Sequence, residues 1–343
     1  MSRFLISILL IVIFSSDLKC QNLNSFDKEN PFSIKGNINF SMNTYSSSKE
    51  NLRQEPFVYV LSGRPTFSFY GIDIPLSITY SNRNLNYSHP FNQVGIAPSY
   101  KWVKVLLGYN SINYSKYVVN GLRIKGIGIE LNPGKFRFSV FKGKMRSAID
   151  FNADPQQNGD YPYRTNNSFE QNGYGFKLGI GTAKTFIDFA FIKAEDDDAS
   201  ITIPDSLATS LEPQANTSLG TSIQLRLHKS LTLSGDAGIS AFTNDQLADT
   251  ITWGSSTAMS IVDPVYAVNE SSQFLYAGEV NLKYRVSNFS TAIAYKRIDP
   301  DYRSLGSYSR LSDMERLSIK SKLSFAKKKI KIGGVLGLSL IHI

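Results

Sequence analysis

Nucleophilic catalysis needs an imidazole held beside a Ser or Cys nucleophile, so the histidines are the first residues to consider. The chain has only three, His89, His228 and His342, and one cysteine, Cys20. His89 precedes Pro90 in a long polar link, and no known catalytic motif surrounds it. We interpret His89 as a solvated loop residue and predict that the protein is not an enzyme.

Metal and cofactor chemistry has few candidates in this sequence. The acidic run at 195–198 offers the oxygen ligands that Ca²⁺ prefers, but it lacks the alternating spacing and the turn glycine of a dedicated calcium loop. We interpret it as a solvated acidic loop. There is no P-loop, dinucleotide fingerprint or Cys/His metal spacing, so we expect no metal and no cofactor. The basic residues are spread along the chain, which argues against a nucleic-acid partner despite a pI of about 9.3.

Basic side chains form the most prominent chemical pattern. Eight of them lie at alternate positions, on the polar side of segments whose other side is apolar: Arg137, Lys177, Arg226, Lys283, Arg285, Lys296, Lys320 and Lys322. Burying such charges in hydrocarbon costs about several kcal/mol each, so this side must face water or other charges. The acids on the same side are mainly Asp188 and Asp236. The pattern predicts either a basic lumen that favours anions or a solvated wall whose charges pair with inward-folded loops.

The segments that position these cations have the period of two that is typical of β-strands. Fifteen strands are predicted, at 34–44, 57–70, 74–82, 93–99, 103–109, 120–131, 135–143, 173–181, 185–193, 217–227, 231–242, 274–285, 289–298, 314–325 and 329–340. Within 122–131 the apolar residues change sides at Gly126, which predicts a β-bulge there.

Short and long links alternate between the predicted strands. The long ones include 144–172 and 243–273, whereas the tight turn at 132–135 is typical of the short ones. Outer-membrane barrels have short periplasmic turns and long external loops. The fold class predicted is therefore all-β: a transmembrane, antiparallel, up-and-down β-barrel in the cell outer membrane.

The composition is consistent with this class and excludes others. Charged residues make up 19% of the chain, compared with about 25% in typical soluble domains. No apolar run after residue 20 approaches the ~18 residues of a membrane helix, and one cysteine cannot form a disulfide within the chain. The 22 Phe and 18 Tyr argue against disorder.

Both ends of the sequence carry further expectations. Residues 1–20 have the charge, the apolar run and the polar exit of a signal peptide, with cleavage after Cys20 favoured over lipidation. Residues 21–33 would be a short N-terminal periplasmic segment, and 34–343 the barrel. Single-chain bacterial barrels close with an even number of strands, so fifteen strands predict a C-terminally truncated chain whose complete form has sixteen or more.

Two segments resemble a known group of proteins. They are Pro90-Phe91-Asn92-Gln93-Val94-Gly95-Ile96-Ala97-Pro98-Ser99-Tyr100-Lys101-Trp102 and, after Gly108-Tyr109, Ile129-Glu130-Leu131-Asn132-Pro133-Gly134-Lys135-Phe136-Arg137-Phe138. Both are similar to a family of uncharacterised outer-membrane β-barrels of the Bacteroidota. The resemblance implies an envelope location and a barrel fold, and it supplies no functional site. The Cys20-Gln21 junction departs from the Ala more usual before the cleavage site of that group.

Two functions compete at this level. One is porin-like passage of small polar or anionic solutes, with anion selectivity falling when Arg137, Lys177 and Arg226 are neutralised. The other is a non-transporting barrel that serves as a surface anchor or as a partner-binding component of an export or adhesion system. In both cases we expect contact with outer-membrane lipid and lipopolysaccharide and with the barrel assembly machinery, and the oligomeric state is left open.

Overall fold

The computed structural model describes residues 31–46, 56–82, 92–150, 167–203, 211–251, 268–307, 313–325 and 329–340. The predicted signal peptide, His89, His342 and parts of the long links lie outside the described residues. Among the described residues, no helix is long and apolar enough to cross a membrane.

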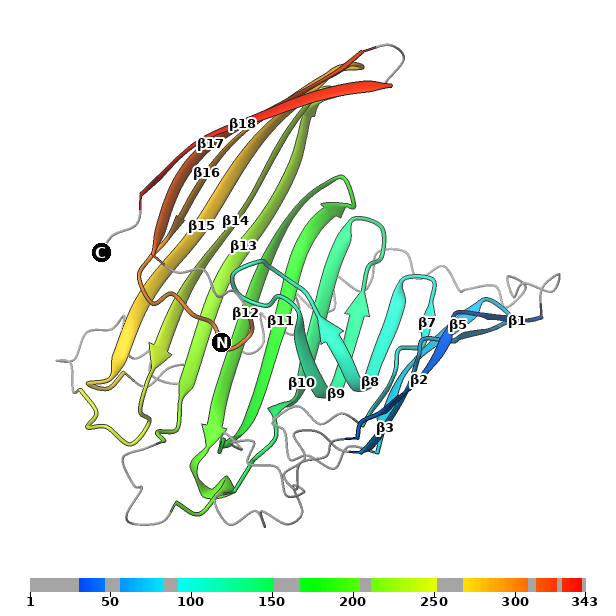
Figure 1. The fold of residues 1–343 in the computed structure, drawn as a ribbon. Coiled ribbons are helices and arrows are strands. Elements are labelled where there is room, and N and C mark those ends of the chain that lie inside the picture. Colours follow the sequence, from blue (N-terminus) through cyan, green and yellow to red (C-terminus); the bar gives the residue numbers. More distant parts are fainter. Residues whose placement is uncertain are drawn as a thin grey trace, which may run out of the picture.

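The fold class is confirmed: the described chain forms one antiparallel sheet of 18 strand segments (Figure 1). Each strand from β8 onward pairs with its neighbours in sequence, which is the up-and-down arrangement. The segments are β1 (Phe32–Lys35), β2 (Ile38–Thr44), β3 (Phe57–Gly63), β4 (Thr66–Phe69), β5 (Ile72–Ser81), β6 (Gln93–Ile96), β7 (Ser99–Tyr100), β8 (Val103–Ile112), β9 (Leu122–Leu131), β10 (Phe136–Arg146), β11 (Glu170–Thr182), β12 (Thr185–Asp197), β13 (Ala215–His228), β14 (Leu231–Thr243), β15 (Ser272–Arg285), β16 (Phe289–Ile298), β17 (Met314–Phe325) and β18 (Ile330–Leu340), with a short 3₁₀ turn, η2 (Asp198–Ser200), after β12.

All fifteen predicted strands are present, and three of them are bent into two segments each. The breaks fall at Gly36-Asn37, Arg64-Pro65 and Ala97-Pro98. Gly36 has a φ of +134°, and a Cβ there would lie 2.3 Å from the Arg64 carbonyl oxygen. Proline cannot donate a ladder hydrogen bond, so Pro65 and Pro98 interrupt the pairing of their strands. The first two breaks lie side by side, since the Arg64 amide donates to the Asn37 carbonyl oxygen. The two neighbouring strands therefore bend at the same place.

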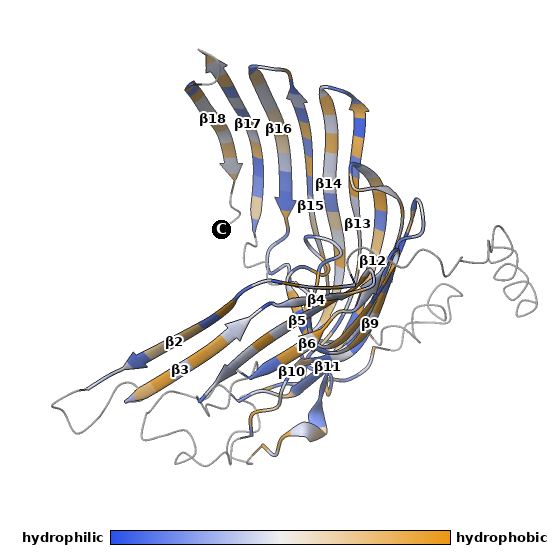
Figure 2. Ribbon diagram, turned by 90° about the vertical axis from the view of Figure 1, so that its right-hand side faces the viewer, coloured by the Kyte–Doolittle hydropathy of each residue, from blue (hydrophilic) through white to orange (hydrophobic). Residues whose placement is uncertain are grey.

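The sheet is curved into a trough rather than lying flat. In Figure 2 the sheet turns at β9–β12, and its two arms, β2–β3 and β16–β18, extend to the same side. β18 takes its register from β17, and β2 takes its register from β3. Because strands are right-twisted, a long antiparallel sheet curls in this way, and the curvature is that of a barrel wall.

Two links fold back onto the concave face of the trough. They are the segment at 113–121, between β8 and β9, and the segment at 299–307, after β16; together we call them the plug. Figure 1 draws the first of them crossing in front of β11 and β12. The core lies between the plug and the sheet, where Tyr117, Val118 and Val119 have no exposed surface and Phe141 has 1%.

The predicted bulge at Gly126 is wrong. β9 keeps an unbroken register with both β8 and β10. The apolar residues change sides because Leu122 and Ile124, on the concave face, are buried in the core beneath the plug. Beyond Gly126, Ile127 points to the opposite face and is 63% exposed.

Candidate functional site

The concave face carries the predicted basic residues in rows that run across the strands. Cross-strand register places Arg226, Thr232, Lys283, Ala292 and Lys320 side by side on β13–β17. A second row, nearer the short turns, joins Arg285, Ser290 and Lys322. We call these two the cation rows, because neither contains an acid.

Small residues separate the cations within each row. Thr232 lies between Arg226 and Lys283, and Ala292 lies between Lys283 and Lys320. The five cations are exposed. Within the part of the chain that the structure describes, none of them forms an ion pair with an acid. The cation rows therefore present a positive surface to whatever occupies the trough.

A third row, farther from the short turns, contains most of the acids. Register aligns Arg137, Gly179, Asp188, Ser222, Asp236, Glu279, Lys296 and Arg316 across β10–β17. Sequence reasoning placed Asp188 and Asp236 on this face but missed Glu279, although its position between Ala277 and Asn281 on the polar side of β15 carried the same alternation signal.

Arg137 lies in this mixed row and is fully engaged. Arg137 Nε donates to Asp188 Oδ1 at 2.8 Å, and Arg137 Nη2 donates to Asp188 Oδ2 at 2.9 Å, so the ion pair is bidentate. The guanidinium also lies over the Phe186 ring, 4.6 Å from its centroid. The structure thus places Arg137 on the predicted face, where Asp188 balances its charge.

Lys177 lies one row further toward the long links. Its ammonium sits 5.4 Å from the centroid of the Tyr114 ring, and Tyr114 belongs to the plug. Of the eight predicted residues, Arg137 thus pairs with Asp188, and Lys177 contacts the Tyr114 ring. Lys296 lies in the mixed row, next to Glu279. The other five form the cation rows.

The plug contacts two acids of the mixed row, Asp236 and Glu279. The Lys116 amide donates to Asp236 Oδ1 at 3.2 Å, and its ammonium forms an ion pair with Glu279. The Tyr117 hydroxyl donates to Glu279 Oε2 at 3.1 Å. The alternative in which the wall's charges pair with inward-folded loops therefore holds for Glu279, whose partner is the Lys116 ammonium of the plug. It does not hold for the cation rows.

The two segments of the plug bind each other as well as the wall. The Tyr302 hydroxyl donates to the Tyr117 carbonyl oxygen at 3.0 Å, and Ser304 Oγ donates to that of Val118 at 2.9 Å. Burial raises the pKa of the Tyr117 and Tyr302 hydroxyls well above 10.0, so both remain neutral donors at physiological pH. Gly238, on the wall, provides the space, since a Cβ there would lie 2.7 Å from the Tyr302 hydroxyl.

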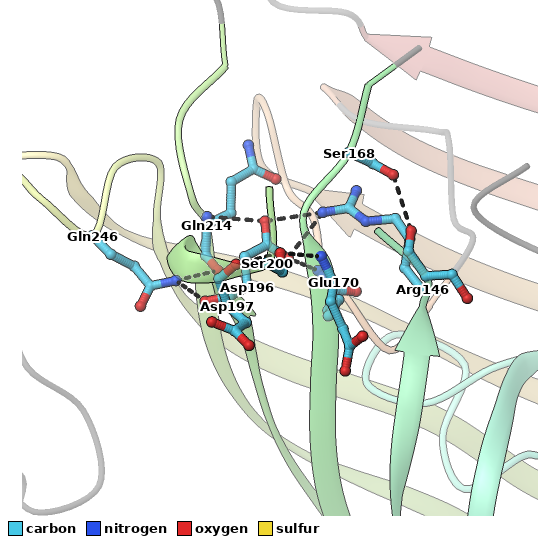
Figure 3. Close-up of polar contacts among 10 residues, drawn as sticks. Arg146, Ser168, Glu170, Asp196, Asp197, Ser200, Gln214 and Gln246 are labelled. Atoms are coloured by element: carbon cyan, nitrogen blue, oxygen red, sulfur yellow. Dashed lines mark hydrogen bonds and ion pairs between the residues drawn. The ribbon is translucent and has the colours of Figure 1, made fainter. Parts of the chain in front are cut away.

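The acidic run at the end of β12 is only partly solvated as the sequence predicted, because Glu195, Asp197 and Asp198 are exposed whereas Asp196 is not. Asp196 is buried and accepts hydrogen bonds from Arg146 Nη2 at 2.9 Å and from Gln171 Nε2 at 2.8 Å (Figure 3). Asp197 caps η2 by accepting from the Ala199 amide. Arg146 balances the charge of Asp196, so this cluster holds the long-link ends of β10–β13 together. Among the described residues, no group of three or more acids, histidines or cysteines could hold a metal ion.

His228, the one histidine within the described residues, is exposed and is the last residue of β13, next to the turn that leads to β14. Its Nδ1 accepts a long hydrogen bond, 3.4 Å, from the Ser230 amide. Among the hydrogen bonds of the described residues, none joins the His228 imidazole to a Ser or Thr hydroxyl.

Comparisons with known proteins return structural likenesses only. No protein-family model matches the chain, and no curated protein matches it. Among solved structures, OccK8 (OprE) of Pseudomonas aeruginosa is 11% identical, with 91% of this chain and 84% of that chain covered and a TM-score of 0.43. OpdQ of the same organism is 9% identical, with 91% and 82% covered and a TM-score of 0.44. A BenF-like porin from Pseudomonas fluorescens Pf-5 is 10% identical, with 93% and 85% covered and a TM-score of 0.44. At these identities and TM-scores the likeness by itself assigns no function.

Proposed function

We propose that this chain forms the wall of an outer-membrane β-barrel through which small polar solutes, anions in particular, pass. Its convex face would contact membrane lipid and lipopolysaccharide, and the barrel assembly machinery would insert it. The observation that carries the proposal is the pair of acid-free cation rows on the concave face. Rings and rows of Lys and Arg along a pore favour anions, because they raise the local anion concentration.

The first test is conductance of the full-length protein in a planar bilayer under a salt gradient. We expect a reversal potential on the anion-selective side. Replacing Arg226, Lys283 and Lys320 together by Gln should lower the anion-to-cation permeability ratio severalfold, since these three residues form the longer cation row.

The matched control removes one Arg and two Lys elsewhere, with Lys35→Gln, Arg64→Gln and Lys142→Gln. All three positions are exposed and belong to neither cation row. An unchanged permeability ratio in the cation-row variant, or an equal fall in both variants, would reject the role of the rows. Arg137 is not used, because its charge is already balanced by Asp188.

The plug favours a second candidate, the non-transporting barrel that anchors a partner at the surface. Its segments cover the concave face of β12–β15 and form hydrogen bonds with wall residues such as Asp236 and Asn216. The same conductance measurement separates the two candidates: a correctly inserted protein that never opens a conducting pathway would support the anchor and reject passage.

A further inference from the structure

A cavity of about 480 Å³ opens on the concave face at the short-turn ends of β11–β15. Five cations line it, namely Lys184, Arg226, Lys229, Lys283 and Arg285, together with neutral polar residues such as Thr232 and Ser234. No acid is among its lining residues. The volume is in the range of small-molecule sites, which span roughly 300–1,000 Å³.

Two short turns are fastened around this cavity. Gln224 Nε2 donates to the Lys184 carbonyl oxygen at 3.1 Å, which ties the β11–β12 turn to β13. Arg226 Nη2 donates to the Lys229 carbonyl oxygen at 3.4 Å, which joins β13 to the next turn. Lys184 and Lys229 therefore belong to turns that are attached to the wall at the cavity.

The nearest row of wall acids lies away from the cations Arg226 and Lys283. On β14, Asp236 is four residues from Thr232, which shares a row with these two cations, or about 13 Å along the strand. That distance exceeds the screening length of about 8 Å at physiological ionic strength. Asp236 and Glu279 are in addition already engaged by the Lys116 amide and ammonium of the plug.

The spacing of the cations sets the kind of ligand. Arg226 and Lys283 flank Thr232 on adjacent strands, so their Cα atoms are about 10 Å apart and both long side chains can reach one anionic group above Thr232. The remaining cations of the cavity require further negative groups. We propose that this cavity binds a small polyanion that carries two or more phosphate or carboxylate groups.

The inference deepens the proposed function and rests on it in one respect: the solute reaches the cavity from the concave side of the wall. Guanidinium groups form forked hydrogen bonds with phosphate or carboxylate oxygens, and ammonium groups act as point charges. Binding of the polyanion at the short-turn end would be a step separate from its passage.

Isothermal titration of the detergent-solubilised full-length protein tests the proposal, with pyrophosphate, citrate and acetate as the three probes. We expect pyrophosphate and citrate to bind at least about tenfold more tightly than acetate, because several charge-assisted hydrogen bonds form at once. The variant Arg226→Gln/Lys283→Gln should weaken pyrophosphate binding by about tenfold or more. The charge-retaining variant Arg226→Lys/Lys283→Arg should retain most of the binding, which would show that the site tolerates substitution.

The matched control is Lys35→Gln/Arg64→Gln, which also removes two positive charges, but at positions outside the cavity. It should leave pyrophosphate binding unchanged. Equal losses in the cavity and control variants, no preference for polyvalent probes, or no binding would each overturn the inference. Conductance measured on the same preparations separates the two proposals. Tight pyrophosphate binding without conductance would defeat only the proposed function, and anion-selective conductance without pyrophosphate binding would defeat only this site.

Discussion

At the scale of single residues, the pair of Arg137 and Asp188 joins a buried carboxylate to a guanidinium on the neighbouring part of the wall. The Asp188 side chain is only 4% exposed, and the Arg137 guanidinium meets both of its oxygens. Arg137→Ala would leave a buried carboxylate without its partner, and we expect a loss of about 3 kcal/mol in the free energy of unfolding. Denaturant unfolding of the protein in detergent micelles measures it.

The double variant Arg137→Gln/Asp188→Asn is the control for this prediction. It removes both charges and leaves amides that can still bond each other, so we expect it to recover most of the lost stability. If Arg137→Ala unfolds at the same denaturant concentration as the wild type, the pair contributes nothing to stability.

Sequence patterns placed Arg137 and Asp188 on one face but could not pair them. Alternation within a strand fixes the face of each residue, whereas their contact depends on the register of β10–β12, which brings together positions 51 residues apart. The same limit explains the acidic run. Asp196 is buried because Arg146, 50 residues away, reaches it, and no local spacing records that contact.

At the scale of elements, the alternation of apolar and polar residues predicted neither the bends within strands nor the plug. A period of two identifies a strand but carries no information on a change in its direction, so 34–44, 57–70 and 93–99 were each predicted as a single strand. The glycine and prolines at the corners carried the signal, since Pro interrupts a ladder and Gly permits a left-handed φ. The plug was hidden because a long polar link has no period, although buried Val118 and Val119 lie within it.

The two segments of the plug approach each other closely at Gly306, in addition to their hydrogen bonds. A Cβ at Gly306 would lie 2.4 Å from the Val118 carbonyl oxygen. Gly306→Ala should therefore push the two segments apart, and we expect proteolysis of 113–121 and 299–307 to become at least severalfold faster while the strands stay protected. Limited proteolysis followed by mass spectrometry measures the cleavage sites.

Gly278→Ala is the matched control for the plug prediction, because the added Cβ would meet only atoms at 3.7 Å or farther. It should leave the cleavage pattern of the wild type unchanged. Equal protection of the plug in Gly306→Ala and in the wild type would mean that the segments tolerate the added methyl group and are not locked by this contact.

At the scale of the whole molecule, the two faces of the sheet differ in chemistry along its length. The convex face exposes large apolar side chains, among them Phe189 at 60% and Leu219 at 55%. The concave face carries the plug, the cation rows and the mixed row. Such a division suits a wall with lipid on one side and water or a folded-in segment on the other. This part of the prediction followed from the sequence because both faces are encoded by residues two apart on each strand.

Ile223 and Gln224 test that division, because they are adjacent on β13 and point to opposite faces. Ile223→Arg puts a charge on the apolar convex face, and if lipid covers that face, we expect it to lower the free energy of unfolding in liposomes by about 2–4 kcal/mol. Gln224→Arg puts the same charge on the concave face beside Arg226, where water remains, and should cost far less. In lipid-free buffer the difference between the two variants should shrink, because an exposed Arg loses no hydration there. Equal costs in liposomes would contradict a lipid-facing convex surface, and a larger cost for Gln224→Arg would reverse the assignment of the two faces.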